Sequence, residues 1–293
     1  MSGRRPTAVL RHGLERLHED YVLSSRLDRY AALLESARSE GYTLLSVSDY
    51  WDRLQSSGGR DGRVLILRHD IDTDPAASED FFQVEDTFGA RATFYFRLST
   101  GRPPLMRSLA GRGADVGYHF EELASVAKER GVTTPADVER ILPEARARFV
   151  DNIESMRQLA GSPMNHAASH GDFANRKLGM RNTVLLEDGA LRVRSHIDFE
   201  AYDAAMMDSV TARFCDAGGG RWTPDDPFQA IREHSPVVYL LTHPRSWIRS
   251  IRSTSGEDIR RIAEGVYFGV GVRCPITKRV DRPASARLRR EAN

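Results

Sequence analysis

Two aspartates lie two residues apart at the end of an apolar run, Val64-Leu65-Ile66-Leu67, which is typical of a buried parallel strand. Because successive strand side chains point to opposite faces, Asp70 and Asp72 share one face, roughly 6.5 to 7 Å apart along the strand. Burying two unpaired acids is costly, and their repulsion disfavours ionisation of both unless a cation lies between them. A divalent metal on one aspartate, with the other free to act as a base, would resolve this conflict.

The plainer alternative is that Asp70 and Asp72 form a turn and an N-cap for the helix that follows. A helix cap needs one acid rather than two on one strand face, so we favour the metal and base interpretation.

Apolar strand-like segments alternate with helix-like segments over most of the chain, and this alternation predicts an α/β fold with a parallel sheet or barrel. Polar side chains stand where several predicted strands end, and such ends converge at the mouth of a βα barrel. The predicted helices cover residues 24–39, 76–88, 103–112 and 134–159, and the predicted strands cover 43–47, 64–67, 91–98, 114–119, 163–170, 211–216 and 236–243.

The composition excludes several classes of protein. A formal net charge of +1 gives no global field that would favour nucleic acid or a membrane as partner. Two cysteines, Cys215 and Cys274, argue against a disulfide scaffold and fit a reducing compartment. The first 20 residues lack an apolar segment of signal-peptide length, and no segment approaches a membrane span. We therefore expect a cytoplasmic protein.

Five motifs, LILRHDID, GARATFYFRLS, ADVGYHFEE, ASHGD and VVYLLTHPRSW, follow one another in the order found in the polysaccharide deacetylase superfamily, carbohydrate esterase family 4. Residues 27 to 250 resemble this family, and its cytoplasmic-type branch, with a His-Asp-hydrophobic-Asp first motif, most closely. The resemblance implies a distorted (β/α)7 barrel and a metal-dependent hydrolysis of an N-acetyl or related amide on a sugar.

The resemblance also implies roles for single residues. Asp70 resembles the catalytic base of the family, and Asp72 resembles its metal-binding aspartate. His119 resembles the first metal-binding histidine, and His243 resembles the late histidine that acts as general acid. The family's Arg-Pro motif near the base is not apparent in this chain.

One further departure concerns the third metal ligand. The family places a second histidine four residues after the first, where this chain has Leu123. We expect His170 to replace it, with Glu122 and His166 as alternatives; His170, which precedes a glycine, could equally be a turn residue. A carboxylate and two imidazoles suit Zn, and Fe, Co, Mn or Ni are compatible with them.

Four more residues are candidates for substrate contact. Asp216, Arg221 and Trp222 flank a glycine-rich loop that resembles a loop of the same branch, although the loop could be a plain flexible turn. Its sequence lacks the lysine and the spacing of a phosphate-binding P-loop. Arg97, on the predicted strand 91–98, could face the barrel mouth.

Together these observations predict a zinc-dependent N-deacetylase acting on a small aminosugar-containing intermediate, such as a sugar nucleotide or a sugar of secondary metabolism. Two alternatives stay open: another carbon–nitrogen hydrolase acting on a cyclic amide or ureide, and a catalytically silent barrel that binds a ligand. We expect a helical N-terminal extension over residues 1–60, a barrel over 61–275 and a mobile basic tail over 276–293. The extension could pack across a barrel face or form a homodimer contact.

Overall fold

The computed structural model describes residues 25–59, 62–216, 222–248, 259, 263–268 and 270. The chain forms two compact units. The first comprises Met1–Ala92 and Val210–Ser255, and the second comprises Thr93–Ser209 and Gly256–Asn293. The predicted basic tail and residues 1–24 lie outside the described part of the chain.

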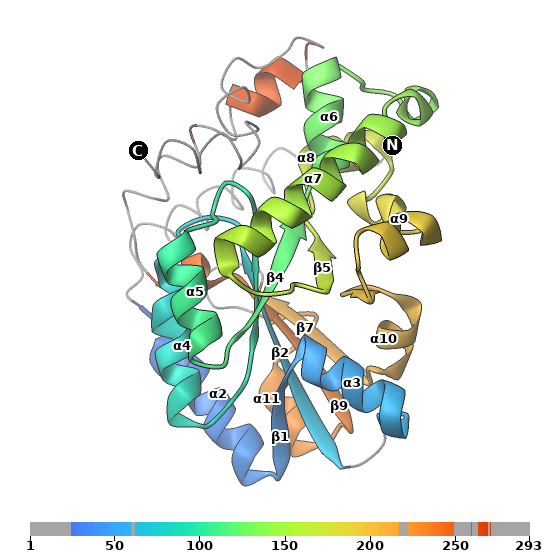
Figure 1. The fold of residues 1–293 in the computed structure, drawn as a ribbon. Helices are drawn as coiled ribbons and strands as arrows, with labels where there is room; N and C mark the ends of the chain where they lie inside the picture. Colours follow the sequence, from blue (N-terminus) through green and yellow to red (C-terminus); the bar gives the residue numbers. More distant parts are fainter. Residues whose placement is uncertain are drawn as a thin grey trace. The chain divides into compact units, whose positions relative to one another are not determined.

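The first unit is a largely parallel sheet with helices beside it (Figure 1). Two of its strands, Arg63–Ile71 and Val237–Thr242, are buried over almost all of their residues. Its elements are α2 (Leu27–Ser39), β1 (Tyr42–Ser46), α3 (Val47–Ser57), β2 (Arg63–Ile71), α4 (Ala77–Thr87), β7 (Ala212–Asp216), β8 (Trp222–Thr223), α11 (Pro227–Arg232), β9 (Val237–Thr242) and the 3-10 turn η3 (Pro244–Ser246).

Strand β2 is central in this unit, because β1 pairs with one of its edges and β9 with the other, both in parallel. Strand β7 pairs in parallel with β9, and the short β8 pairs antiparallel with β7. The carboxyl ends of β2, β9 and β7 therefore lie at one edge of the sheet. The polar residues that follow them in the sequence belong to this edge.

The second unit has the same alternation of strands and helices. Its strands β3 (Thr93–Phe96), β4 (Asp115–Phe120), β5 (His166–Ser169) and β6 (Phe199–Glu200) pair in that order, all in parallel. The helical segments are α5 (Pro103–Gly111), α6 (Glu122–Arg130), η1 (Pro135–Arg140), α7 (Leu142–Ala160), α8 (Phe173–Leu178), η2 (Asn182–Leu185), α9 (Gly189–Arg194) and α10 (Ala204–Ser209).

Parallel strands joined by helices confirm the predicted α/β class, and they are the elements from which a distorted (β/α)7 barrel is built. Helix α2 buries the apolar stripe that its sequence predicts, with Tyr30, Leu33, Leu34 and Ala37 inside. Strand β2 runs to Ile71, so His69 and Asp70 belong to the strand instead of following it.

Two helical regions differ from the prediction. The segment predicted as one helix over 134–159 is a 3-10 turn followed by α7, which begins at Leu142. Pro143 explains the division, because a proline is tolerated in the first turn of a helix but breaks its interior. Helix α6 was not predicted, and it is buried over most of its length.

The segment before β2 contributes to the first unit directly. Strand β1 pairs with β2 over five residues, from Tyr42 with Arg63 to Ser46 with Leu67. The compact units divide the chain at residues 92 and 209, whereas the predicted boundaries at 60 and 275 stay predictions. None of the helices in the described part of the chain is long and apolar enough to cross a membrane.

Candidate active site

Asp70 is held by the arginine that stands two residues before it on β2. The two side chains share a strand face, and Nε and Nη2 of Arg68 donate to the two carboxylate oxygens of Asp70 at 2.8 Å each. Both residues are buried, and Nη1 of Arg68 also donates to the hydroxyl of Tyr239 at 3.3 Å. A bidentate pair fixes the plane of the carboxylate, so Arg68 orients Asp70. The signal for this contact was present in the sequence as an arginine at position i−2 of the strand.

Asp72 and His243 lie near each other at the ends of neighbouring strands. Asp72 follows β2, His243 follows β9, and Nε2 of His243 lies 3.9 Å from Oδ2 of Asp72. Both side chains are about a quarter exposed, at 27% for Asp72 and 26% for His243. The first unit thus brings together three predicted residues, Asp70, Asp72 and His243, at one edge of its sheet.

The orientation of His243 is set by Asp216, the last residue of β7. The Asp216 carboxylate accepts hydrogen bonds from the backbone N–H of His243 at 2.7 Å and from its ring Nδ1 at 2.5 Å. The indole Nε1 of Trp247 donates to the same carboxylate at 2.9 Å. Since a carboxylate can only accept, Nδ1 of His243 carries a proton and Nε2 is the ring nitrogen left for other contacts.

The charge on His243 follows from the same contact. Burial alone would lower the pKa of His243, but the Asp216 carboxylate, together with Asp72 and Asp70, raises it to about 10. These carboxylates therefore favour the protonated ring, the form that can give up a proton. Asp216 was predicted to contact substrate; that role stays a prediction, and the contact that the structure shows is with His243.

Cys215 lies beside this pair, with ligand atoms of Cys215, Asp216 and His243 within 4.8 Å of one another. Burial, and after it the carboxylates of Asp216 and Asp70, raise the pKa of the Cys215 thiol to about 12. A thiol binds metals as the thiolate, and the histidine and aspartate already bind each other. This group does not fit a metal site.

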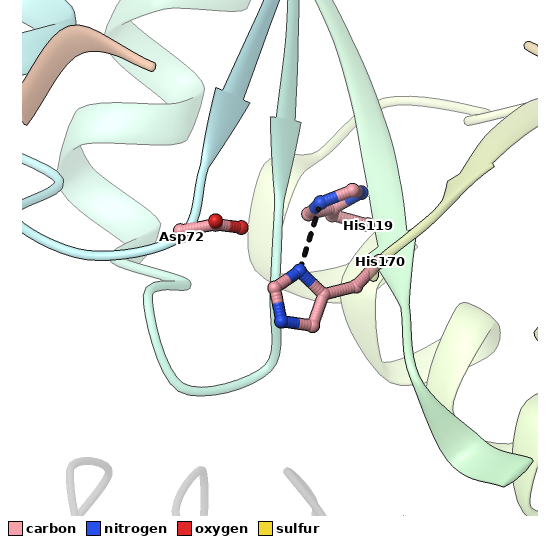
Figure 2. Close-up of side chains that lie close together, drawn as sticks. All are labelled: Asp72, His119 and His170. Atoms are coloured by element: carbon pink, nitrogen blue, oxygen red, sulfur yellow. Dashed lines mark hydrogen bonds between the residues drawn. The ribbon is translucent and has the colours of Figure 1, made fainter. Parts of the chain in front are cut away.

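His119 and His170 form a pair in the second unit, and Figure 2 shows their rings in contact. His119 is the penultimate residue of β4, and its Nδ1 lies 3.0 Å from the carbonyl oxygen of Ala168. Nδ1 must therefore donate, and in the neutral ring the lone pair is then on Nε2. His170 follows β5, and its Nδ1 lies 3.3 Å from that Nε2. Asp72, also labelled in Figure 2, belongs to the first unit.

The spacing of these two nitrogens fits a shared metal ion. Two nitrogens that bind one zinc at about 2.0–2.1 Å in tetrahedral geometry lie roughly 3.3–3.4 Å apart. The carbonyl of Ala168 fixes the tautomer of His119 in the way that carbonyl partners orient metal-bound histidines. The donor set of the second unit therefore fits a divalent metal.

A second group in this unit, Glu121, His170 and Asp172, also has its ligand atoms within 4.8 Å of one another. Its carboxylates are already matched by cations. Arg97 donates to both oxygens of Glu121 at 2.6–2.9 Å, and Nζ of Lys128 lies 2.9 Å from Asp172. Burial alone would raise the pKa of Glu121, but Arg97, His170 and Lys128 lower it to about 2. A further cation would therefore gain little here. The substrate contact of Arg97 stays a prediction.

Of the three alternatives for the third ligand, His170 is the one that contacts His119. His166 opens β5, four residues before His170, and its ring nitrogens bind Tyr95 at 3.0 Å and Asp115 at 2.9 Å. The carboxylate of Glu122 is buried and bound to the hydroxyl of Tyr118 and to the Asn152 amide. Both alternatives have partners of their own within the fold of the second unit.

Glu122 should make stability depend on pH. Burial raises its pKa from 4.5 to about 6, so the folded state binds this proton more tightly than the unfolded state. The resulting stability is complete below pH 4.5 and is lost as the pH rises through 6. We expect the wild type to lose about 1 kcal/mol more stability than Glu122→Gln between pH 5 and pH 8.

Urea unfolding at the two pH values would measure this difference, because any hydrogen bond that glutamine fails to make weakens the variant equally at both. Glu154→Gln, on an exposed part of α7, is the matched control and should follow the wild type. An equal pH dependence in wild type and Glu122→Gln would contradict the prediction.

Two predicted substrate residues remain to be placed. Arg221 lies outside the described residues. Trp222 opens β8, and its ring centroid lies 5.1 Å from that of Trp247, the residue bound to Asp216. Its contact with substrate stays a prediction.

No protein-family model and no curated protein sequence matches this chain. Among solved structures, the peptidoglycan deacetylase PdaC from Bacillus subtilis, a single-site mutant, is similar to it with 14% sequence identity and a TM-score of 0.38. The alignment covers 80% of this chain and 99% of that one. Similarity at this level establishes neither a shared family nor a shared activity.

Proposed function

We propose that this protein is a divalent-metal-dependent amide hydrolase that removes the acetyl group from a small aminosugar-containing intermediate, such as a sugar nucleotide or a secondary-metabolite sugar. One observation carries the proposal: a carboxylate and a histidine, each held in a single orientation by a partner, lie at the same edge of paired strands. Amide hydrolysis needs a base for the attacking water and an acid for the leaving amine.

Asp70 is the proposed base, because a carboxylate can accept a proton from water and Arg68 holds this one in a single orientation. His243 is the proposed acid. Its Nδ1 proton is bound to Asp216, so the proton that it transfers to the departing nitrogen is the one on Nε2. After transfer the ring is neutral, with Nδ1 still donating to Asp216.

Asp72, His119 and His170 are the proposed metal ligands. The 3.3 Å separation of the two histidine nitrogens supports this assignment. A metal held by these residues would acidify water and polarise the amide carbonyl. One carboxylate and two imidazoles favour zinc, and Fe, Co, Mn and Ni also suit this donor set.

The substrate class and the cytoplasmic location come from the sequence resemblance and the composition, and both are part of the proposal. The test is release of acetate from a panel of N-acetylated amino sugars and their nucleotide derivatives by protein reconstituted with each metal. We expect acetate release that stops when a chelator removes the metal and resumes when the metal is restored.

Each other outcome would decide against the proposal. Turnover of cyclic amides or ureides without acetate release from sugars would assign a different carbon–nitrogen hydrolase. Absence of stoichiometric metal under every reconstitution, with no turnover, would indicate a silent ligand-binding protein.

A further inference from the structure

A chain of hydrogen bonds between four buried side chains crosses the first unit behind the proposed base and acid. The hydroxyl of Tyr30 on α2 donates to Oε1 of Glu85 on α4 at 2.6 Å. Nε2 of His69 on β2 lies 2.5 Å from the same oxygen, and Nδ1 of His69 lies 2.5 Å from the hydroxyl of Thr242 on β9. All four residues are at most 1% exposed. We call Tyr30, Glu85, His69 and Thr242 the buried relay.

The donors and acceptors of the buried relay are consistent along its length. A carboxylate can only accept, so Tyr30 and Nε2 of His69 both donate to Glu85, and Nδ1 of His69 is hydrogen-bonded to the hydroxyl of Thr242. Burial and the neighbouring carboxylate raise the pKa of Tyr30 well above 10, so the hydroxyl keeps the proton that it donates. The two hydrogen bonds to Glu85 therefore have a defined direction.

One end of the buried relay, His69 and Thr242, lies directly before the proposed base and acid in the sequence. His69 and Thr242 are partners in the last rung of the parallel ladder between β2 and β9. Asp70 and His243 are the next residues along the chain, the first within β2 and the second directly after β9. Because side chains alternate along a strand, the rung faces the side opposite to Asp70. The contact between His69 and Thr242 thus fixes the two backbones at the points from which base and acid project.

Helix α2 and the residue before it also contact the segment that follows the proposed acid, at Ser246 and Trp247. The backbone N–H of Arg26, at the start of α2, donates to the carbonyl of Trp247 at 2.9 Å, and its guanidinium donates to the carbonyl of Ser246. The ring centroid of Tyr30 lies 6.0 Å from that of Trp247. Trp247 in turn donates to the Asp216 carboxylate that orients His243.

We propose that helix α2 belongs to the catalytic apparatus, with His69 and Thr242 as positioning residues that lock the base-bearing strand to the acid-bearing strand. The inference rests on the proposed function in one respect, the identity of base and acid. Helix α2 lies within residues 1–60, so the inference gives this part of the chain a role in positioning the base and the acid. Surface packing or a dimer contact would not supply that role.

Two matched pairs of variants test the buried relay. Tyr30→Phe removes the relay hydroxyl, whereas Tyr42→Phe removes a hydroxyl that donates to the carbonyl of Ser235 at 2.7 Å, in the same unit and outside the relay. Thr242→Val removes the other end of the relay at constant shape, and Thr242→Ser keeps the hydroxyl.

We expect Tyr30→Phe and Thr242→Val to lower kcat by about tenfold, because misplaced catalytic groups lose rate with little change in binding. KM and metal content should change less than twofold. Tyr42→Phe should lower the melting temperature by a few degrees and leave kcat unchanged, and Thr242→Ser should restore most of the kcat lost in Thr242→Val. Equal kcat in the two tyrosine variants would overturn the proposal.

A readout that needs no substrate separates this inference from the proposed function. The proton on Nδ1 of His243, shared with Asp216 at 2.5 Å, should give a downfield proton resonance by NMR. Tyr30→Phe and Thr242→Val should shift or broaden it, whereas Tyr42→Phe and Thr242→Ser should not. If the wild type releases no acetate but the resonance responds in this way, the proposed function fails and the relay stands. A resonance unmoved in both relay variants overturns the relay.

Discussion

Asp70→Asn is expected to lower kcat by a factor of ~10²–10⁴, the range that a positioned general base contributes. Asparagine keeps the shape of the side chain but cannot accept the proton of the attacking water. The proposed metal ligands, Asp72, His119 and His170, are unchanged in this variant. Metal analysis of the purified variant should therefore give the stoichiometry of the wild type, together with a severe loss of acetate release.

The buried charge of Arg68 requires a control. Removing one partner of a buried ion pair commonly costs ~3–5 kcal/mol, so Asp70→Asn could lose activity by unfolding. The double variant Arg68→Met with Asp70→Asn removes both charges and should melt closer to the wild type while staying inactive. Near-full activity in Asp70→Asn, or in a folded double variant, would show that Asp70 is not the base.

Replacing either histidine of the second-unit pair should remove the metal. His119→Gln and His170→Gln each delete one of three proposed protein ligands, and even partners outside the first coordination sphere contribute about 10–100-fold to metal affinity. We expect each variant to bind zinc at least ~100-fold more weakly and to retain below about 1% of the activity at a fixed low metal concentration. Competition with a fluorescent chelator measures the affinity.

His166→Gln is the control for this experiment. His166 is a buried histidine of the same unit, bound to Tyr95 and Asp115 and stacked on Phe199 at a centroid distance of 5.1 Å. It should lose stability and keep its metal. If His170→Gln binds metal as tightly as the wild type while His166→Gln does not, the choice of the third ligand is wrong.

The parts of the fold that could be predicted are those with a local signal. The stripe of α2 follows the helical period, and the aliphatic runs of β2 and β9 mark buried strands. Helix α6 gave no such signal, because it is buried over most of its length and so lacks a polar face to set against an apolar one.

In the candidate active site too, some features could be predicted from the sequence and others could not. Asp70, Asp72 and His243 could be chosen because acids and a histidine end strands of strong pattern. The contact of Arg68 with Asp70 was predictable from strand alternation, since it spans two residues. The contacts of Asp216 with His243 and of Thr242 with His69 span 27 and 173 residues, and only the pairing of the strands brings them together. Sequence patterns of short range carry no record of such pairs.

The three donors that converge on Asp216 have a consequence for how a reaction could proceed. Turning the imidazole of His243 out of its plane would break its bond to a carboxylate that also anchors the indole of Trp247 and the main chain. If His243 is the acid, as proposed, it donates its proton from a fixed position, and the leaving nitrogen has to be brought to it. Selectivity among acetylated compounds would then depend on whether a bound compound places its amide nitrogen next to Nε2 of His243. Compounds that bind with the amide elsewhere would not react.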